Sequence, residues 1–102
     1  MSSGGNGQPS TFQVRHSKKI LELIKKLHQT AHLQGRGQQF LDALRFVYER
    51  LQRDPRDLGE PLYRLPALHL VIFHVLVKPI VVDYAVHEER PLVLIQGVRL
   101  LD

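Results

Sequence analysis

Two stretches of the chain repeat their apolar residues at the spacing of an α-helix. The first begins after Ser17, which stands where a helix N-cap is expected, and its apolar stripe covers residues 20–31. The second stripe covers residues 40–51, and Pro55 ends the pattern because proline disfavours helix in the residue before it and lacks an N–H. A short connection containing two glycines separates the stripes. The pattern therefore predicts two amphipathic helices packed as a hairpin.

The remaining apolar segments follow the period of a β-strand. Residues 11–15 alternate and predict one short strand, residues 68–77 are almost wholly apolar, residues 80–87 alternate again, and residues 92–100 resemble a final strand. The links between the last three are a lysine–proline turn and a short polar loop, which suit antiparallel neighbours and are too short for a parallel crossover. The predicted fold is α+β: an N-terminal strand, a helical hairpin, then a three-stranded antiparallel meander with the helices on one face.

Composition restricts the class of protein. Of the 102 residues, 1–10 are mostly turn formers and predict a disordered tail, which leaves residues 11–102 as a single domain. Cysteine is absent, so disulfides and thiolate chemistry are excluded. No apolar run is long enough to span a membrane and no secretory leader is evident, so we expect a cytoplasmic protein without membrane partners.

The net charge of +4 is unevenly distributed. Residues 15–56 contain ten Lys/Arg and four acids, whereas residues 57–102 contain four Lys/Arg and six acids. A basic helical half suits an anionic partner such as RNA, DNA or an acidic protein tail, although ordinary solvated helix faces have the same composition. The candidate nucleic-acid-binding residues are Lys18, Lys19, Lys25, Lys26, Arg64 and Lys78.

Several short motifs occur in a recognisable order. They are Leu51-Gln52-Arg53-Asp54-Pro55, Gly59-Glu60-Pro61-Leu62, Val77-Lys78-Pro79-Ile80, Tyr84-Ala85-Val86 and, in the last strand, Gly97-Val98-Arg99. Their order and spacing over residues 12–101 resemble the RelE/ParE toxin superfamily, whose fold has the arrangement β-α-α-β-β-β.

The resemblance implies a toxin component of a bacterial type II toxin–antitoxin pair, neutralised by an antitoxin protein and needing no cofactor. RelE-like toxins cut mRNA on the ribosome without metal, and ParE-like toxins share the fold and poison DNA gyrase. The alternative is a non-catalytic relative that binds nucleic acid or protein, the latter as a gyrase-like target or as a homodimer.

Residues that could serve an endoribonuclease are Arg64, His87 and Arg99. Two positions depart from the family pattern. The arginine that RelE-like toxins place three residues before the tyrosine of Tyr84-Ala85-Val86 is Val81, which offers no donor to a phosphate. The family's tyrosine or histidine beyond the last basic residue has no counterpart after Arg99.

Histidines give no metal prediction. His28 and His32 have the i,i+4 spacing that allows two imidazoles to share one ion, but no third ligand is evident nearby. His69 and His74 differ by an odd number in the apolar run and point to opposite faces. His87 shares a face with Asp83, where a surface contact and a catalytic dyad are both open.

The apolar run predicts a second uncovered face. Helices can cover only one side of the sheet, and apolar residues occur on both. The predicted partner-binding residues are Val71, Phe73, Val75, Val81 and Ala85. An antitoxin segment is the favoured occupant of that face, and a second copy of the chain is the rival.

Overall fold

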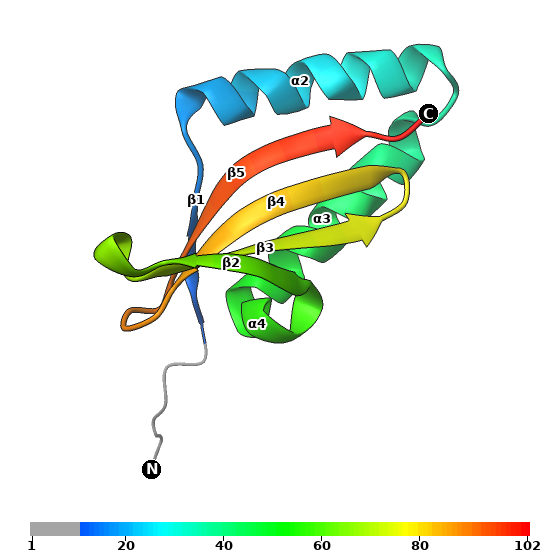
Figure 1. The fold of residues 1–102 in the computed structure, drawn as a ribbon. Helices are drawn as coiled ribbons and strands as arrows, with labels where there is room; N and C mark the ends of the chain where they lie inside the picture. The colour runs from blue at the N-terminus through cyan, green and yellow to red at the C-terminus, as the bar shows by residue number, and fades with distance from the viewer. Residues whose placement is uncertain (1–10) are drawn as a thin grey trace.

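Five strands form one mixed sheet in the computed structural model, which describes residues 11–102 (Figure 1). The elements in chain order are β1 (Gln13–Arg15), α2 (Lys18–Leu33), α3 (Gly37–Arg53), α4 (Pro55–Leu58), β2 (Glu60–Leu65), the 3-10 turn η1 (Pro66–Leu68), β3 (Leu70–Val77), β4 (Ile80–His87) and β5 (Leu92–Leu100). The α+β class is confirmed. The predicted three-stranded meander has four strands instead, because β2 also pairs antiparallel with β3. The prediction of a disordered tail falls on residues 1–10, outside the described residues.

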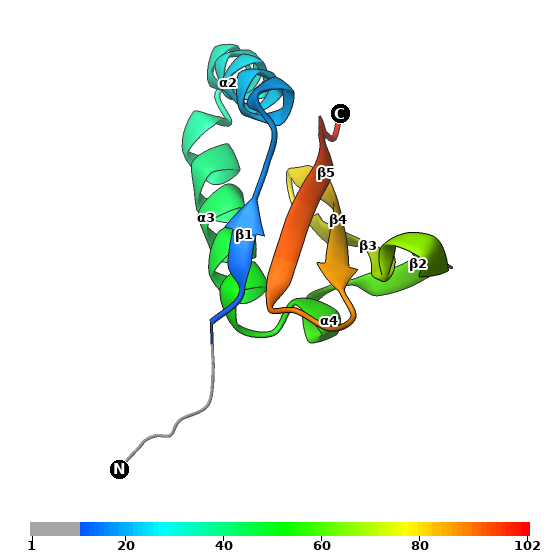
Figure 2. The same ribbon diagram turned by 90° about the vertical axis from the view of Figure 1, so that its left-hand side faces the viewer.

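The sheet has the strand order β1-β5-β4-β3-β2. Neighbouring strands from β2 to β5 are antiparallel, whereas β1 runs parallel to β5 and pairs with it only over residues 92–94. The first strand of the domain therefore lies at the sheet edge beside the last one (Figure 2).

The two long helices begin and end where the sequence predicts. The Ser17 hydroxyl accepts a hydrogen bond from the backbone N–H of Ile20 at 3.2 Å, which caps α2. Gly35 ends that helix region with φ +76°, a conformation that only glycine adopts without strain. Pro55 stops α3 but also starts α4, because proline suits the first position of a helix.

The main core lies between α2, α3 and one face of the sheet. α3 contributes the fully buried side chains of Phe40, Val47 and Leu51. The sheet contributes alternate residues of its central strands, including Tyr84 and Val86 of β4. Figures 1 and 2 show α3 behind the central strands and α2 along the β5 edge, so the opposite face of the sheet is open.

Tyr84 anchors the helical layer to the sheet. Its ring stacks on Phe73 with centroids 5.4 Å apart, and its hydroxyl donates a 2.6 Å hydrogen bond to the backbone carbonyl of buried Pro55. Gly59 passes so close that a Cβ there would lie 2.8 Å from the Tyr84 hydroxyl and 2.4 Å from the carbonyl oxygen of His74. Burial raises the pKa of Tyr84 to about 12.

Three of the five predicted partner-binding residues do not lie on an uncovered face of the sheet. Phe73 and Val75 are buried in the main core beneath the helices, and Val71 packs against the same core. Their partners on β4 are even-numbered, since Val77 pairs with Ile80 across the turn. The odd-numbered residues of β3 and those of β4 therefore lie on opposite faces of the sheet.

Ala85 and Val81 lie on the open face, apart from the other three. Ala85 is fully buried by a small second cluster of the chain's own side chains. That cluster contains Leu65, Leu70, Ile72, Ala85 and Leu94. Val81 is half-buried beside Leu76, which is 56% exposed. Much of the predicted uncovered surface is thus covered within a single chain.

Candidate functional site

The three predicted catalytic residues do not form one site. Arg99 lies opposite Val81 in the β4–β5 pairing, whereas His87 lies at the other end of β4. The two positions are six steps apart along β4, which corresponds to about 20 Å at the rise of an extended strand. Arg64 lies near His87, so the structure brings these two together and leaves Arg99 apart.

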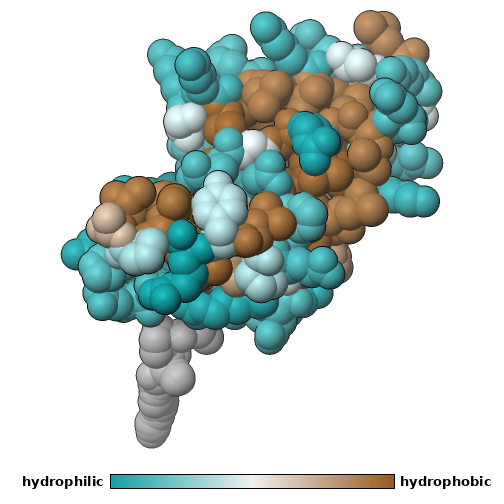
Figure 3. Space-filling model, viewed as in Figure 1, coloured by the Kyte–Doolittle hydropathy of each residue, from teal (hydrophilic) through white to brown (hydrophobic). Residues whose placement is uncertain are grey.

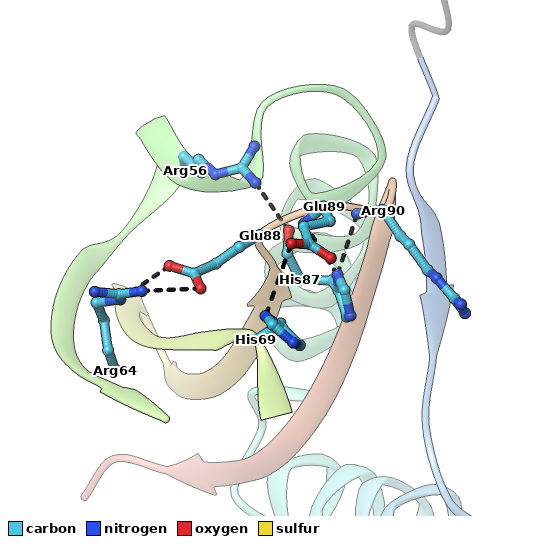
Figure 4. A network of polar contacts seen from close by, with 7 residues as sticks. All are labelled: Arg56, Arg64, His69, His87, Glu88, Glu89 and Arg90. Carbon is cyan, nitrogen blue, oxygen red and sulfur yellow. Dashed lines mark hydrogen bonds and ion pairs between the residues drawn. The ribbon is translucent and has the colours of Figure 1, made fainter. Parts of the chain in front are cut away.

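Arg64 belongs to a polar cluster at the β4–β5 loop (Figure 4). Its guanidinium donates two hydrogen bonds to the carboxylate of Glu88, at 2.9 and 3.1 Å. This pairing holds the pKa of Glu88 below its usual value and raises that of Arg64. Arg56 donates to the backbone carbonyl of His87 at 2.9 Å, and His69 approaches Glu89 at 3.8 Å.

His87 forms its side-chain hydrogen bonds within the same loop. Its Nδ1 accepts hydrogen bonds from the backbone N–H groups of Glu89 and Arg90, at 3.0 and 3.1 Å. Both bonds use the single lone pair of Nδ1, so this nitrogen serves as an acceptor within the loop. Arg64 is likewise paired, with the carboxylate of Glu88. Together these contacts join β2 and the β2–β3 connection to the β4–β5 loop.

The predicted basic surface follows α2. Lys18, Lys19, Lys25 and Lys26 are all exposed, and Glu22 is the only acid on that helix. Lys78 lies apart from them in the β3–β4 turn. Arg64 is at the opposite end of the sheet. The six predicted nucleic-acid-binding residues therefore divide into one helix face and two separate positions.

A groove between α2 and β5 is the main feature that the sequence did not indicate. It consists of two hollows along the seam, with volumes of about 490 and 450 Å³. The first is lined by Arg15, His16, Ser17, Lys19, Ile20, Leu94, Ile95 and Gln96. The second is lined by Leu23, Leu27, Thr30, Gln34, Arg36, Val98, Arg99, Leu100, Leu101 and Asp102. We call these two hollows together the α2–β5 groove.

The groove combines an apolar lining with cations. Ile20, Leu23 and Leu27 turn from α2 towards it, and leucines and valine of β5 complete the apolar part. Figure 3 shows apolar side chains gathered over α2 and the adjacent strand ends on the open face, bordered by hydrophilic ones. An apolar surface of this kind with a charged border is typical of a site for another molecule.

Metal binding has no support in residues 11–102. No group of three or more His, Asp or Glu side chains in that part of the chain could hold an ion. The ring of His28 stacks on Phe40 with centroids 5.7 Å apart, which gives this half-buried side chain a packing role. His74 and Asp83 face each other across β3 and β4 on the open face, a pairing that only the strand register reveals.

None of the helices within residues 11–102 combines the length and the apolar composition of a transmembrane span. Comparisons with protein families, with curated proteins and with solved structures returned no match for this chain.

Proposed function

We propose that this chain is a RelE/ParE-like toxin component of a type II toxin–antitoxin pair that acts by binding a large target and is neutralised by an antitoxin. The support is the order of elements: a strand, a helical hairpin and a terminal antiparallel meander, on a chain with the motifs described above. α4 and η1 are additional elements, and β2 adds a fourth antiparallel strand to the meander.

A toxin that binds its target without catalysis is the function most consistent with the positions of the predicted catalytic side chains. Arg64 and His87 are held by partners within the chain, Arg99 lies about 20 Å away along the sheet, and Val81 offers no donor on the open face. A metal-free ribonuclease needs several donors converging on one phosphate. The geometry favours the non-catalytic form of the toxin over the mRNA endonuclease.

The test is induced expression in a bacterial host that lacks the neighbouring reading frame. The expected result is growth arrest, reversed when the neighbouring frame is expressed together with the chain. Tyr84→Asp places a charge in the core and serves as the unfolded control, which should not arrest growth. Normal growth at a high level of soluble wild-type protein would contradict the proposal.

Mapping of RNA ends in arrested cells separates the two modes of action. Intact transcripts are expected for a binding toxin. New cleavage ends that disappear with Arg99→Ala would instead assign the endonuclease to this chain.

A second candidate function is nucleic-acid binding by the exposed lysines of α2. Each phosphate contact to a single strand contributes roughly 0.7 to the slope of log K against log salt. Replacing Lys18, Lys19, Lys25 and Lys26 by alanine should therefore lower the slope for a poly(U) oligonucleotide by about 2.8. Arg45→Ala on α3 is the control. An unchanged slope after the fourfold replacement would exclude α2 as the binding surface.

A further inference from the structure

The first hollow of the α2–β5 groove is bordered by three elements of the chain. β1 pairs with β5 as far as Leu94, and α2 packs against the residues of β5 that follow. The hollow, of about 490 Å³, is lined by the end of β1, the connection to α2, the first turn of α2 and residues 94–96 of β5. A volume of this size fits a small molecule, whereas a strand or helix would have to displace one of the three elements.

The polar lining of the hollow carries positive charge. Arg15 and Lys19 are exposed, and neither belongs to an ion pair among residues 11–102. No acidic residue of the described chain lines the hollow. Because the Ser17 hydroxyl already caps α2 through the N–H of Ile20, the two side-chain cations are the main attraction for an anion.

His16 adds a positioned imidazole to the two cations. Its Nδ1 lies 3.0 Å from the hydroxyl of Tyr48 on α3, and the two rings are nearly perpendicular, with centroids 6.3 Å apart. Burial raises the pKa of Tyr48, so the phenol keeps its proton at neutral pH and can donate it to Nδ1. This contact fixes the ring and leaves Nε2 for an occupant. An imidazole, a guanidinium and an ammonium group around one hollow suit a phosphate group.

The rest of the lining is mostly apolar. Ile20 of α2 and Leu94 of β5 are half-buried, and Ile95 is buried. An inorganic anion would leave these side chains uncovered, and a purely apolar molecule would make no use of the cations. The ligand that fits both parts has an anionic group on a compact apolar body.

We propose that this hollow binds a small phosphorylated molecule, whose phosphate contacts Arg15, His16 and Lys19 and whose apolar part packs on Ile20 and Leu94. The site is separate from the toxin function proposed above. It needs no protein partner, and the outcome of the growth assay does not decide it.

Titration of the full chain with phenyl phosphate, followed by amide NMR, tests the proposal. Shift changes are expected to concentrate at residues 15–20 and 94–96. Phenyl phosphate should bind at least roughly tenfold more tightly than either inorganic phosphate or phenol, because only the ester uses both parts of the hollow. Arg15→Gln and Lys19→Gln should each weaken its binding roughly fivefold, through loss of one partly exposed charge contact.

Matched controls lie on the same helix. Lys18→Gln and Lys26→Gln remove the same charge from exposed positions of α2 that do not line the hollow. They should change the affinity for phenyl phosphate by less than about twofold, because salt screens charges that are not in contact with the ligand. All four replaced side chains are exposed, so the variants should keep the wild-type fold and its amide spectrum.

Several results would overturn the proposal. They are binding of phenyl phosphate no tighter than that of inorganic phosphate, equal losses in the Lys18→Gln and Lys19→Gln variants, and shift changes that lie elsewhere in the chain. Displacement of phenyl phosphate by a hexauridine oligonucleotide with a free 5′-hydroxyl, at an affinity that Lys19→Gln lowers, would assign the hollow to a nucleic-acid backbone instead.

Discussion

Removing one oxygen atom from Tyr84 tests how the helical layer is fastened to the sheet. Tyr84→Phe keeps the ring, which is fully buried and stacked on Phe73, so the apolar contribution is nearly unchanged. It deletes the hydroxyl that donates the 2.6 Å hydrogen bond to the backbone carbonyl of Pro55. Pro55 is buried, so its carbonyl oxygen loses this hydrogen bond. An unsatisfied buried acceptor costs about 1–3 kcal/mol.

Urea denaturation at pH 7 measures this cost. We expect the free energy of unfolding to fall by about 2 kcal/mol with an unchanged m-value, which corresponds to a melting temperature lower by roughly 8–16 °C for a domain of this size. Tyr63→Phe is the control, because Tyr63 is 56% exposed, and it should change stability by less than about 0.5 kcal/mol. A Tyr84→Phe loss as small as that of the control would refute the role assigned to this hydrogen bond.

The same pair of proteins gives an independent check in alkali. The folded pKa of Tyr84, about 12, is above the ordinary value of 10.0, so its stabilising effect is complete below pH 10 and is lost as the pH rises towards 12. At pH 11 the unfolded state gains about 1.4 kcal/mol from ionisation of this phenol, whereas the folded state gains almost nothing. The advantage of Tyr84 over phenylalanine should shrink by about that amount between pH 9 and pH 11.

Three further predictions concern the backbone and the surface. Gly59→Ala should lower the free energy of unfolding by about 1–3 kcal/mol, because its Cβ would meet the backbone of β3, whereas Gly97→Ala, whose nearest neighbour lies at 3.7 Å, should be tolerated in the same urea titration. Ser17→Ala should cost about 1 kcal/mol through loss of the α2 cap, and Ser17→Asp should restore it; equal stability of all three forms would contradict the cap. Arg64→Gln should raise the pKa of the Glu88 carboxyl towards its usual value, which carbon NMR titration of Glu88 would measure. The ion pair stabilises the fold above the usual pKa of Glu88 and loses this effect as the pH falls, so the variant should lack that pH-dependent contribution. An unchanged pKa of Glu88 would show that the pairing does not persist in solution.

The helices and the last three strands could be predicted because their patterns are long. α2 and α3 extend for 16 and 17 residues and repeat their apolar positions over several turns. β2 was missed because it is almost wholly exposed, contains Pro61 and has a register shift, so its side chains do not alternate. α4 was missed because Pro55 was interpreted only as the end of a helix, although proline also favours the first turn of the next one.

The error in the partner face has an identifiable cause. Alternation shows which residues of a strand share a face, but it does not show which face the helices cover. The two-residue turn at Lys78-Pro79 does contain the missing information about the neighbouring strand. It places Val77 opposite Ile80, so odd positions of β3 face even positions of β4, and Phe73 cannot share a surface with Val81.

The groove could not be predicted from the sequence because it depends on where β1 stops. The alternation predicts a short first strand, but it does not indicate which strand β1 pairs with. The structure places β1 beside Leu92 to Leu94 and then turns the chain at His16 into α2. That turn leaves residues 95–100 of β5 without a strand neighbour on this side and places the leucines of α2 against them, so that α2 and β5 form the groove.

The pairing of β1 with β5 also determines when the domain can be completed during synthesis. Gln13 is among the first described residues to leave the ribosome, yet its partner Leu92 is among the last. The helices rely on local contacts and form early, but the sheet edge stays open until nearly the whole domain has emerged. A truncation that removes β5 would leave β1 without a partner and one side of the core uncovered, so an interrupted translation product would be a substrate for proteases and chaperones rather than a smaller folded domain.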